Sequence, residues 1–343
     1  MKILAIESSC DETAAAIVEN GRRVLSNAVY TQIDIHKIYG GVVPEIASRK
    51  HTEKITAVVQ SALDQAQITE KDLDAIAVTY TPGLIGALLT GVGFAKAYAY
   101  GLNLPLIPVH HLRGHVASNY LTSAQLKPPF LALIVSGGHS HIVRVKDYTD
   151  YEILGRTHDD AAGEAFDKVA RILDIGYPGG REIERLAADG NCDALHLPHS
   201  TFSDNPYDFS FSGLKTSVIN YVHKCRQNGE SFNRADVAAS FCDTITSTLC
   251  DHFIKAALDH NEKELVLAGG VSANTMLRKK ISQAAEKHGM NLFMPELKYC
   301  GDNAAMIASQ AFYEHEKGTV AKLDLNAYAT MDITANYAAS MEY

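Results

Sequence analysis

Residues 3–18 read ILAIESSCDETAAAIV, and residues 130–145 read FLALIVSGGHSHIVRV. In each segment an apolar run stops at small polar or glycine residues and then resumes, a pattern typical of a strand, a polar turn and a second strand. The two segments therefore predict two β-hairpins of the same kind, one at the start of the chain and one near its middle.

A second pattern also occurs twice. Residues 74–83 read DAIAVTYTPG and lead into an apolar helix, and residues 264–274 read ELVLAGGVSAN and lead into a helix over residues 275–285. Each stretch predicts a buried strand, a glycine turn and the start of a helix. The order of hairpin and strand–turn–helix is the same in both halves, which favours duplication of one α/β unit. Because such elements are common, coincidence of the two pairs is the alternative.

The chain has 343 residues, a length that predicts two domains of ordinary size. We expect the first domain over residues 1–128 and the second over residues 129–325, with an insertion near residues 150–215. Residues 326–343 form a weakly patterned C-terminal tail. The polar segment 117–129 ends in Lys-Pro-Pro and is the expected hinge between the domains.

The composition is that of a globular chain. Apolar residues make up 46%, and 31 basic against 40 acidic side chains give a net charge of −9. These values exclude a disordered or collagenous chain. A duplex-coating protein is normally basic, so a nucleic-acid role would need a local patch or a partner. The basic stretches are residues 49–51 with Lys54, and residues 278–280, but runs of charge on helices are usually solvated faces.

The sequence predicts a soluble, cytoplasmic protein without membrane association. Its six cysteines form no CxxC pair, so they are expected to be reduced thiols rather than a disulfide framework or a zinc ribbon. The apolar run at the N-terminus stops at Glu7 and is too short for a signal peptide. The long uncharged run 75–95 contains Pro82 and several glycines, which indicates a strand, a turn and a buried helix.

The motif HLRGH is the sharpest candidate for chemistry. His111 and His115 are four residues apart, so on a helix they share one face and can grip a divalent or trivalent metal. A zinc protease would carry Glu directly after the first histidine, where this chain has Leu112, which disfavours that class. His110 faces another way, and Asp302, which opens a later helix, is the natural third ligand. The alternative is that these histidines are solvated or satisfied core residues.

The turns of the two predicted hairpins are also candidate sites. Residues 136–140, SGGHS, allow a phosphate to approach the backbone N–H groups. The counterpart, ESSCDE at residues 7–12, carries Asp11 and Glu12, which would repel a bare phosphate. These two acids indicate a metal-bridged phosphate or an acid/base role. Together the turns favour a nucleotide bound in a cleft between the two domains.

Two further motifs admit both structural and ligand-binding interpretations, and a third predicts a strand. Ser272 and Asn274 end the glycine turn and either cap the next helix or contact a ligand. Asp167 is typical of a ribose-hydroxyl acceptor, whereas the Pro-Gly-Gly of residues 177–180 is by default a turn. Residues 208–215 alternate polar and aromatic side chains, which predicts an edge strand.

Taken in order, these motifs resemble the TsaD family, the catalytic subunit of tRNA N6-adenosine threonylcarbamoyltransferase, once described as a glycoprotease. The matching stretches are ESSCDET (7–13), YGGVVPEIASRKH (39–51), PVHHLRGH (108–115), LIVSGGHS (133–140), DDAAGEAFDK (159–168), YPGG (177–180), DFSFSGLKT (208–216), LAGGVSAN (267–274) and CGDNAAMIA (300–308). They cover nearly the whole chain to about residue 325, and the last twenty or so residues match nothing familiar.

The resemblance implies an α/β fold of two duplicated actin-like domains (ASKHA, RNase H-like) with a nucleotide and metal cleft between them. It implies transfer of a threonylcarbamoyl group from threonylcarbamoyl-AMP to N6 of the adenosine just 3′ of the anticodon, in tRNAs that read codons beginning with adenine. It implies one metal ion per subunit, iron with zinc as the alternative, held by His111, His115 and Asp302. The partners implied are tRNA, a TsaB-like actin-fold protein and a TsaE-like ATPase, with a separate synthase making the adenylate.

The resemblance also assigns donor-binding residues. They are Ile134, Val135, Ser136, Gly137, Gly138, Asp167, Gly180, Glu184 and Asn274. Many relatives carry Asp at the position of Glu184, which keeps the carboxylate but changes its reach.

The donor is a mixed anhydride, so AMP is already a good leaving group. The enzyme must place a weakly nucleophilic amine, stabilise charge at the carbonyl and remove a proton. We hypothesise that Asp11 or Glu12 accepts that proton. The other classes are a sugar or acid kinase of the same fold, a metalloprotease and a nucleotide-sensing scaffold without turnover.

Overall fold

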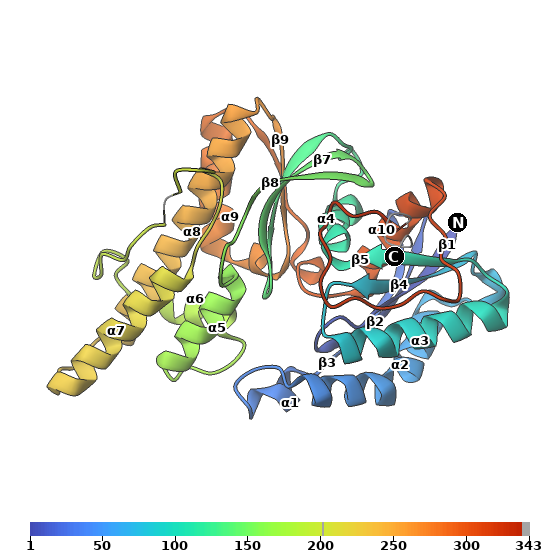
Figure 1. Cartoon of the computed structure of the whole chain (residues 1–343), viewed down its shortest axis with the longest axis horizontal. Coiled ribbons are helices and arrows are strands. Elements are labelled where there is room, and N and C mark those ends of the chain that lie inside the picture. The colour runs from blue at the N-terminus through green and yellow to red at the C-terminus, as the bar shows by residue number, and fades with distance from the viewer. Residues whose placement is uncertain (201, 338–343) are drawn as a thin grey trace. The chain divides into compact units, whose positions relative to one another are not determined.

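The computed structural model describes residues 1–200 and 202–337, which divide into two compact units (Figure 1). Unit 1 comprises Met1–Pro129, Val145–Glu152 and the described residues from Met294 onward, and unit 2 comprises Phe130–Arg144 and Ile153–Phe293. One of the boundaries between the units lies after Pro129, at the end of the polar segment 117–129, whose first part is helical. Each unit is described below by itself.

Unit 1 is built on one five-stranded sheet. Its elements are β1 (Lys2–Glu7), β2 (Glu12–Glu19), β3 (Arg23–Thr31), α1 (Ile33–Lys37), α2 (Pro44–Ala66), β4 (Ala75–Thr81), α3 (Ile85–Leu102), β5 (Leu106–His110), α4 (His111–Thr122) and α10 (Ala304–Glu316), with short 3-10 turns at Glu70–Asp72 and Leu297–Tyr299.

The second sheet also has five strands. The elements of this half are β6 (Phe130–Val135), β7 (Ser140–Asp147), β8 (Asp150–Arg156), α5 (Ala162–Ile172), α6 (Gly179–Ala187), α7 (Ser212–Asn228), α8 (Arg234–Asp259), β9 (Glu264–Ala268), a 3-10 turn (Gly270–Ala273), α9 (Thr275–Lys287) and β10 (Asn291–Phe293).

The two sheets have the same topology. The strand orders are β3-β2-β1-β4-β5 and β8-β7-β6-β9-β10. In the first sheet β1 pairs antiparallel with β2 and parallel with β4, and in the second β6 pairs parallel with β9. Each hairpin is thus followed in the chain by a strand that pairs with its first member. The predicted duplication of an α/β unit is confirmed.

The core of unit 1 follows the two-residue period of its strands. Leu4 and Ile6 of β1 belong to the cluster that packs against α2 and α3, whereas Ile3 and Ala5 belong to the cluster that packs against α10. Successive side chains of a strand point to opposite faces, so a fully apolar strand requires cover on both sides. Helices on each face supply that cover, which gives unit 1 three layers (Figure 1).

The C-terminal part of the chain belongs to unit 1, although the sequence analysis expected the second domain to continue to residue 325. The reason is that α10 packs its apolar face, including Met306 and Ile307, on the first sheet. The chain then runs back over unit 1, where the Tyr328 N–H donates to the Tyr80 carbonyl over 2.9 Å. Residues 338–343 of the predicted tail lie outside the described residues.

Two sequence predictions differ from the structure in the second half. The expected insertion near residues 150–215 begins too early, because β8 (Asp150–Arg156) is a strand of the sheet and the counterpart of β3. The predicted edge strand over residues 208–215 is wrong. Only Thr157 and Phe209 form an isolated bridge there, and α7 begins at Ser212.

The uncharged run 75–95 is β4, a turn and α3, as the sequence predicts. No helix among the described residues could cross a membrane.

Candidate metal centre

The candidate centre lies at one edge of the first sheet. The strands β1, β4 and β5 are parallel, so their carboxyl ends meet at this edge, where ligand sites of open α/β sheets are found. The strand β1 ends at Glu7, and β5 continues without a loop into α4, whose first residue is His111. One helical turn later, His115 lies on the same face, as the spacing predicts.

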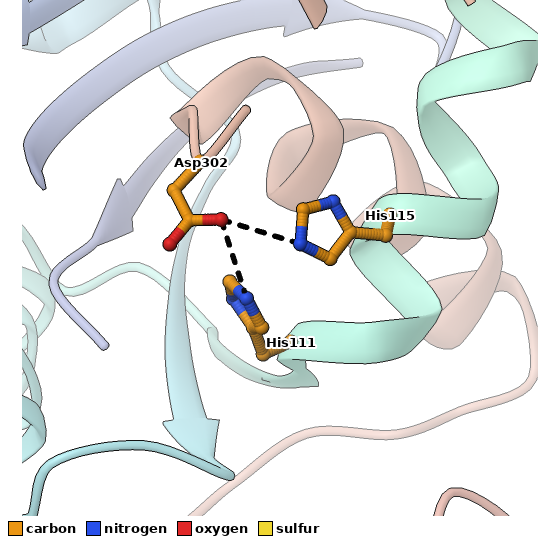
Figure 2. A group of neighbouring side chains, drawn as sticks. All are labelled: His111, His115 and Asp302. Atoms are coloured by element: carbon orange, nitrogen blue, oxygen red, sulfur yellow. Dashed lines mark ion pairs between the residues drawn. The ribbon is translucent and has the colours of Figure 1, made fainter. Parts of the chain in front are cut away.

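His111, His115 and Asp302 converge on one point (Figure 2). Nε2 of His111 is 3.5 Å and Nε2 of His115 is 3.2 Å from Oδ1 of Asp302. One possible ligand atom from each residue lies within 4.8 Å of the others. Both histidines are buried, whereas Asp302 is partly exposed. The structure therefore brings together all three residues that were predicted as metal ligands.

The residues between the two histidines explain why α10 approaches α4. At Gly114 a Cβ atom would lie 2.6 Å from Cδ1 of Ile307 in α10, so the absence of a side chain permits close packing of the two helices. The buried Arg113 donates to Glu314 of the same helix over 2.9 Å. At the start of α10, Oδ1 of Asn303 accepts from the Met306 N–H over 3.0 Å, which caps the helix directly after Asp302.

His110, the last residue of β5, is held elsewhere, as expected for a residue adjacent to His111. Its Nδ1 accepts from the Leu112 N–H over 3.2 Å, so this side chain caps α4. Its Nε2 is 3.3 Å from the carbonyl of Met331. Both ring nitrogens therefore have contacts outside the three-residue cluster.

A buried carboxylate lies behind the cluster. Glu7 is fully buried, and its Oε2 is 3.0 Å from Nδ1 of His111. Burial raises the pKa of Glu7, but the charge and hydrogen bond of His111 outweigh it, so the pKa lies below its ordinary value. Burial also lowers the pKa of His111, yet the carboxylates of Glu7 and Asp302 raise it well above its ordinary value. His111 thus lies between two carboxylates, and a positive charge on its ring stabilises both of them.

The electrostatics of the other two ligands are complementary. Burial raises the pKa of Asp302, but the charge and hydrogen bond of His111 and the contact with His115 bring it well below its ordinary value. Burial lowers the pKa of His115, which favours the neutral, ligating form of the ring. Nδ1 of His115 is buried and has no hydrogen-bond partner in the described part of the chain.

This arrangement fits a divalent metal ion. Two histidines and one carboxylate are the protein ligands of hydrolytic zinc sites and of non-haem iron sites, which leave further positions open. A cation at the centre would satisfy the charge of Asp302 and Glu7 and would replace the proton of His111. The donor set therefore suits the iron or zinc that was expected, without distinguishing between them.

The two predicted catalytic acids lie on the turn between β1 and β2. Asp11 is buried, and its carbonyl accepts from the Gln32 N–H over 3.0 Å. Glu12 begins β2, and its Oε1 accepts from the Thr31 hydroxyl over 3.2 Å. Burial, together with the negative charges of Asp11 and Asp302, raises the pKa of Glu12 well above its ordinary value. A carboxylate with a raised pKa is a stronger proton acceptor.

The basic stretches considered for RNA are partly used inside the protein. His51 is fully buried, with Nδ1 2.8 Å from the Thr13 hydroxyl and Nε2 2.8 Å from the Cys10 carbonyl. In the second stretch, Arg278 donates to the Ser272 carbonyl over 2.6 Å and Lys280 pairs with Asp243 over 2.6 Å. His51 therefore anchors the turn that carries the acids instead of offering charge to RNA.

Unit 2 contains all the residues predicted to bind the donor. Ile134 and Val135 are buried at the end of β6, and Ser136, Gly137 and Gly138 form the turn to β7, with both glycines exposed. The turn is closed by the Ser136 N–H, which donates to the His139 carbonyl over 2.8 Å. The Ser136 N–H is therefore used within the turn, and the two exposed glycines lie at the carboxyl end of β6.

Close backbone contacts surround that turn. A Cβ atom at Gly163 in α5 would lie 2.6 Å from the carbonyl oxygen of Ser136, and one at Gly269 would lie 2.3 Å from that of Val135. Gly269 also has a φ of 90°, which favours glycine. The glycines of two separate motifs thus allow α5 and the end of β9 to approach the turn.

Three of the predicted donor-binding side chains bond to amides at helix starts. Oδ1 of Asp167 accepts from the N–H of Gly179, the first residue of α6, over 2.7 Å. Glu184 accepts from the N–H of Thr275, the first residue of α9, over 2.7 Å, and Asn274 caps the same helix. The capping interpretation of Asn274 is confirmed. Gly180 follows Gly179 in α6 and is half-buried.

Several residues around the centre were missed by the sequence analysis. Thr79 donates to Glu7 over 2.6 Å, and the Ser9 N–H donates to Glu7 over 2.5 Å. The available signal was a Glu at the end of the otherwise apolar strand 2–7, because a buried carboxylate there must find partners. The roles of Arg113 and His51 carried no such local signal.

Comparison with known proteins assigns the family. The model of the family described as "TsaD: tRNA N6-adenosine threonylcarbamoyltransferase" matches residues 23–309. The chain belongs to the TsaD family. A Clostridium kluyveri protein named tRNA N6-adenosine threonylcarbamoyltransferase is 52% identical over 334 residues, covering 97% of this chain and 98% of its own. The Clostridium novyi protein of the same name is 53% identical over 334 residues, with the same coverage. Members of the TsaD family are transferases, and this chain is one of them.

Solved structures with low sequence identity show the same fold. Full-length HypF in its phosphate- and nucleotide-bound form superposes with a TM-score of 0.62 at 14% identity, covering 96% of this chain and 47% of HypF. Component A of (R)-2-hydroxyglutaryl-CoA dehydratase from Acidaminococcus fermentans gives 0.53 at 15% identity, covering 92% of this chain and 96% of its own. The predicted actin-like (ASKHA) fold of this TsaD family member is confirmed.

Proposed function

We propose that this chain transfers the threonylcarbamoyl group of threonylcarbamoyl-AMP to N6 of the adenosine just 3′ of the anticodon, in tRNAs that read codons beginning with adenine. The observation that carries the proposal is the convergence of His111, His115 and Asp302 in a chain 52% identical to a named transferase over 97% of its length. We also propose, as expected from the sequence, that the chain acts in the cytoplasm. Its proposed partners are a TsaB-like actin-fold protein and a TsaE-like ATPase.

In the proposed reaction N6 attacks the carbamoyl carbon, the bond from that carbon to the phosphate oxygen breaks, and AMP leaves with the electron pair. The proton of N6 passes to the carboxylate of Asp11 or Glu12 on the β1–β2 turn. The raised pKa of Glu12 favours it as the acceptor. His51 and Gln32 hold this turn through the carbonyls of Cys10 and Asp11, which limits its movement during transfer.

The donor is proposed to bind unit 2. The N–H groups of Gly137 and Gly138 suit the phosphate of the adenylate, and the carboxylate of Asp167 suits the ribose hydroxyls. Iron or zinc held by His111, His115 and Asp302 would supply positive charge that offsets the phosphate and polarises the donor. These assignments agree with the resemblance of the motifs to the family.

The test is a reconstituted transfer assay. The purified chain, its presumed partners, synthetic threonylcarbamoyl-AMP and unmodified tRNA are incubated, and the digested nucleosides are analysed by mass spectrometry. We expect threonylcarbamoyladenosine, lost in His111→Ala and Asp302→Ala and retained in His223→Ala, which alters an exposed histidine of α7. Failure of the folded, metal-loaded protein to form product would overturn the proposal and return attention to a kinase. Chelator-sensitive peptide cleavage would instead support the protease.

A further inference from the structure

The hydrogen bonds of the buried Glu7 distinguish one of its oxygens from the other. Oε1 accepts from the Ser9 N–H over 2.5 Å. Oε2 accepts from the Thr79 hydroxyl over 2.6 Å and lies 3.0 Å from Nδ1 of His111. A carboxylate can only accept hydrogen bonds, so the ring that faces it carries its proton on Nδ1. Nε2 points toward Asp302, so it also carries a proton while no metal is bound, and a metal ion that replaces this proton takes the Nε2 lone pair (Figure 2).

We propose that Glu7 is a positioning residue that fixes the tautomer and orientation of His111, so that Nε2 is available to a metal ion. Carboxylate–histidine–metal arrangements of this kind orient the ligand and raise its basicity. The proposal rests on the metal centre proposed above. It assigns a role to a residue that lies outside the ligand set and outside the acid pair of the turn.

The Nδ1 atoms of the two histidines have different surroundings, so the inference applies to His111 and not to His115. His111 has Glu7 on its Nδ1, with the Ser9 hydroxyl 3.2 Å from the same atom. By contrast, Nδ1 of His115 is buried without a hydrogen-bond partner among residues 1–200 and 202–337. Glu7 therefore acts on one of the two ligands only. Loss of its carboxylate is expected to change His111 and to leave the ring of His115 as it is.

The substitution Glu7→Gln tests this because an amide cannot reproduce both sides of a carboxylate. The Ser9 N–H is a backbone donor that cannot turn away, so the amide oxygen must remain on that side. The amide NH2 then replaces Oε2. There the Thr79 hydroxyl can rotate to accept, and His111 can accept only if Nδ1 loses its proton. The variant is therefore expected to move the proton of His111 to Nε2, the nitrogen proposed for the metal.

The tautomer is read directly by two-bond 1H–15N correlation spectra of protein labelled with 15N-histidine. The spectra are taken of the metal-free protein at a pH raised until the 15N shifts of His111 are those of a neutral ring, and His111 is assigned with His111→Asn. We expect Nδ1–H in the parent chain and Nε2–H in Glu7→Gln. Competition with a chelator is expected to show zinc affinity reduced about 10–100-fold in Glu7→Gln.

Thr79→Val is the matched control. It removes one donor from the same oxygen of Glu7 and leaves the carboxylate facing His111, so we expect the Nδ1–H tautomer and zinc affinity within about threefold of the parent. If Glu7→Gln does not fold, Glu7→Asp keeps the charge and shortens its reach, and is expected to weaken zinc binding in the same direction.

The outcomes separate the two proposals. An unchanged tautomer in Glu7→Gln, or an equal loss of zinc affinity in Thr79→Val, overturns the role of Glu7. A parent chain that shows the expected tautomer but binds neither zinc nor iron overturns the metal centre and leaves the control of the ring by Glu7 intact.

Discussion

The guanidinium of Arg113 donates to the carboxylate of Glu314 over 2.9 Å, with both side chains buried. The same guanidinium also donates to the carbonyls of Ile333 and Ala335, each over 2.9 Å through Nη2. Arg113 lies between the two candidate metal ligands in the sequence but serves another surface of α4. One side chain thus joins this helix to α10 and to the chain that follows it.

We predict that Arg113→Leu destabilises unit 1 by about 3–5 kcal/mol, because it leaves Glu314 charged and without its buried partner. Replacing both residues by leucine is expected to cost less than the sum of the single changes. Urea unfolding followed by circular dichroism measures both. Lys317→Ala provides the control, since its pair with Asp147 is exposed and should contribute under about 1 kcal/mol. Equal losses of unfolding free energy in Arg113→Leu and Lys317→Ala would contradict the prediction.

His51 predicts a pH dependence of stability. Burial lowers its pKa from 6.5, with only partial compensation by the hydrogen bond to the Cys10 carbonyl. In the unfolded chain the ring keeps its ordinary pKa, so below about 6.5 the unfolded state binds more protons and the contribution of His51 to stability falls. The stability difference between the parent and His51→Asn should therefore narrow on acidification from neutral pH.

The measurement is the free energy of unfolding in urea near pH 7.5 and near pH 5.5, on either side of the ordinary histidine pKa. At the higher pH we expect His51→Asn to cost about 1–3 kcal/mol, for the loss of two buried hydrogen bonds. Taking the difference between the two proteins cancels the titration of the other histidines. A difference that grows on acidification would contradict the lowered pKa.

Gly163 gives a prediction about the turn 136–138. A Cβ at this position would meet the Ser136 carbonyl oxygen at 2.6 Å and the Gly137 Cα at 2.8 Å, which are backbone atoms. Gly163→Ala should therefore displace the turn and weaken binding of an adenylate analogue about tenfold or more, although alanine favours the helix by about 1 kcal/mol. Calorimetric titration measures the affinity.

Gly213→Ala is the comparison for that experiment, because nothing lies within 4 Å of a Cβ there and the residue is also helical. It should leave the affinity unchanged. Equal affinities in both variants would show that the turn moves freely or takes no part in binding.

Asp167 provides a test of structural against ligand-binding roles. Because it accepts the Gly179 N–H at the start of α6, we predict that Asp167→Ala lowers the stability of unit 2 by about 1 kcal/mol without any ligand present. Asp167→Asn keeps an oxygen acceptor and should recover most of that loss. Thermal unfolding and hydrogen exchange of the Gly179 amide report the effect. Loss of donor affinity with unchanged stability would mean that the contact to Gly179 contributes nothing.

The local sequence patterns were sufficient to predict the duplicated units and the pair of metal-ligating histidines, His111 and His115. Both depend on short-range periodicity: two residues per repeat in the strands and nearly four in α4. The prediction of an edge strand over residues 208–215 was wrong because the interaction that starts a helix there comes from a residue distant in sequence. Oδ1 of Asp159 accepts from the N–H of Phe211 over 2.8 Å and of Ser212 over 3.2 Å, which starts α7 there. A local alternation of polar and aromatic residues contains no trace of that cap.

The strand β8 was missed for a different reason. Its sequence, DYEILGR, is only partly apolar, and its burial pattern lacks a regular alternation. An edge strand with one covered face is specified mainly by its neighbour in the sheet. In the same way, the approach of Asp302 to the histidines depends on the packing of α10 at Gly114, which no spacing rule contains.

The late position of α10 in the chain has a consequence for biosynthesis. A ribosome completes all of unit 2, residues 153–293 included, before it makes the helix that covers one face of the first sheet. Until then α10 does not cover the apolar side chains of that face, among them Ile3 and Ile107, and nascent-chain chaperones can bind them. The third candidate metal ligand, Asp302, lies directly before that helix and is synthesised with it. The centre is therefore completed only after unit 2 has been synthesised.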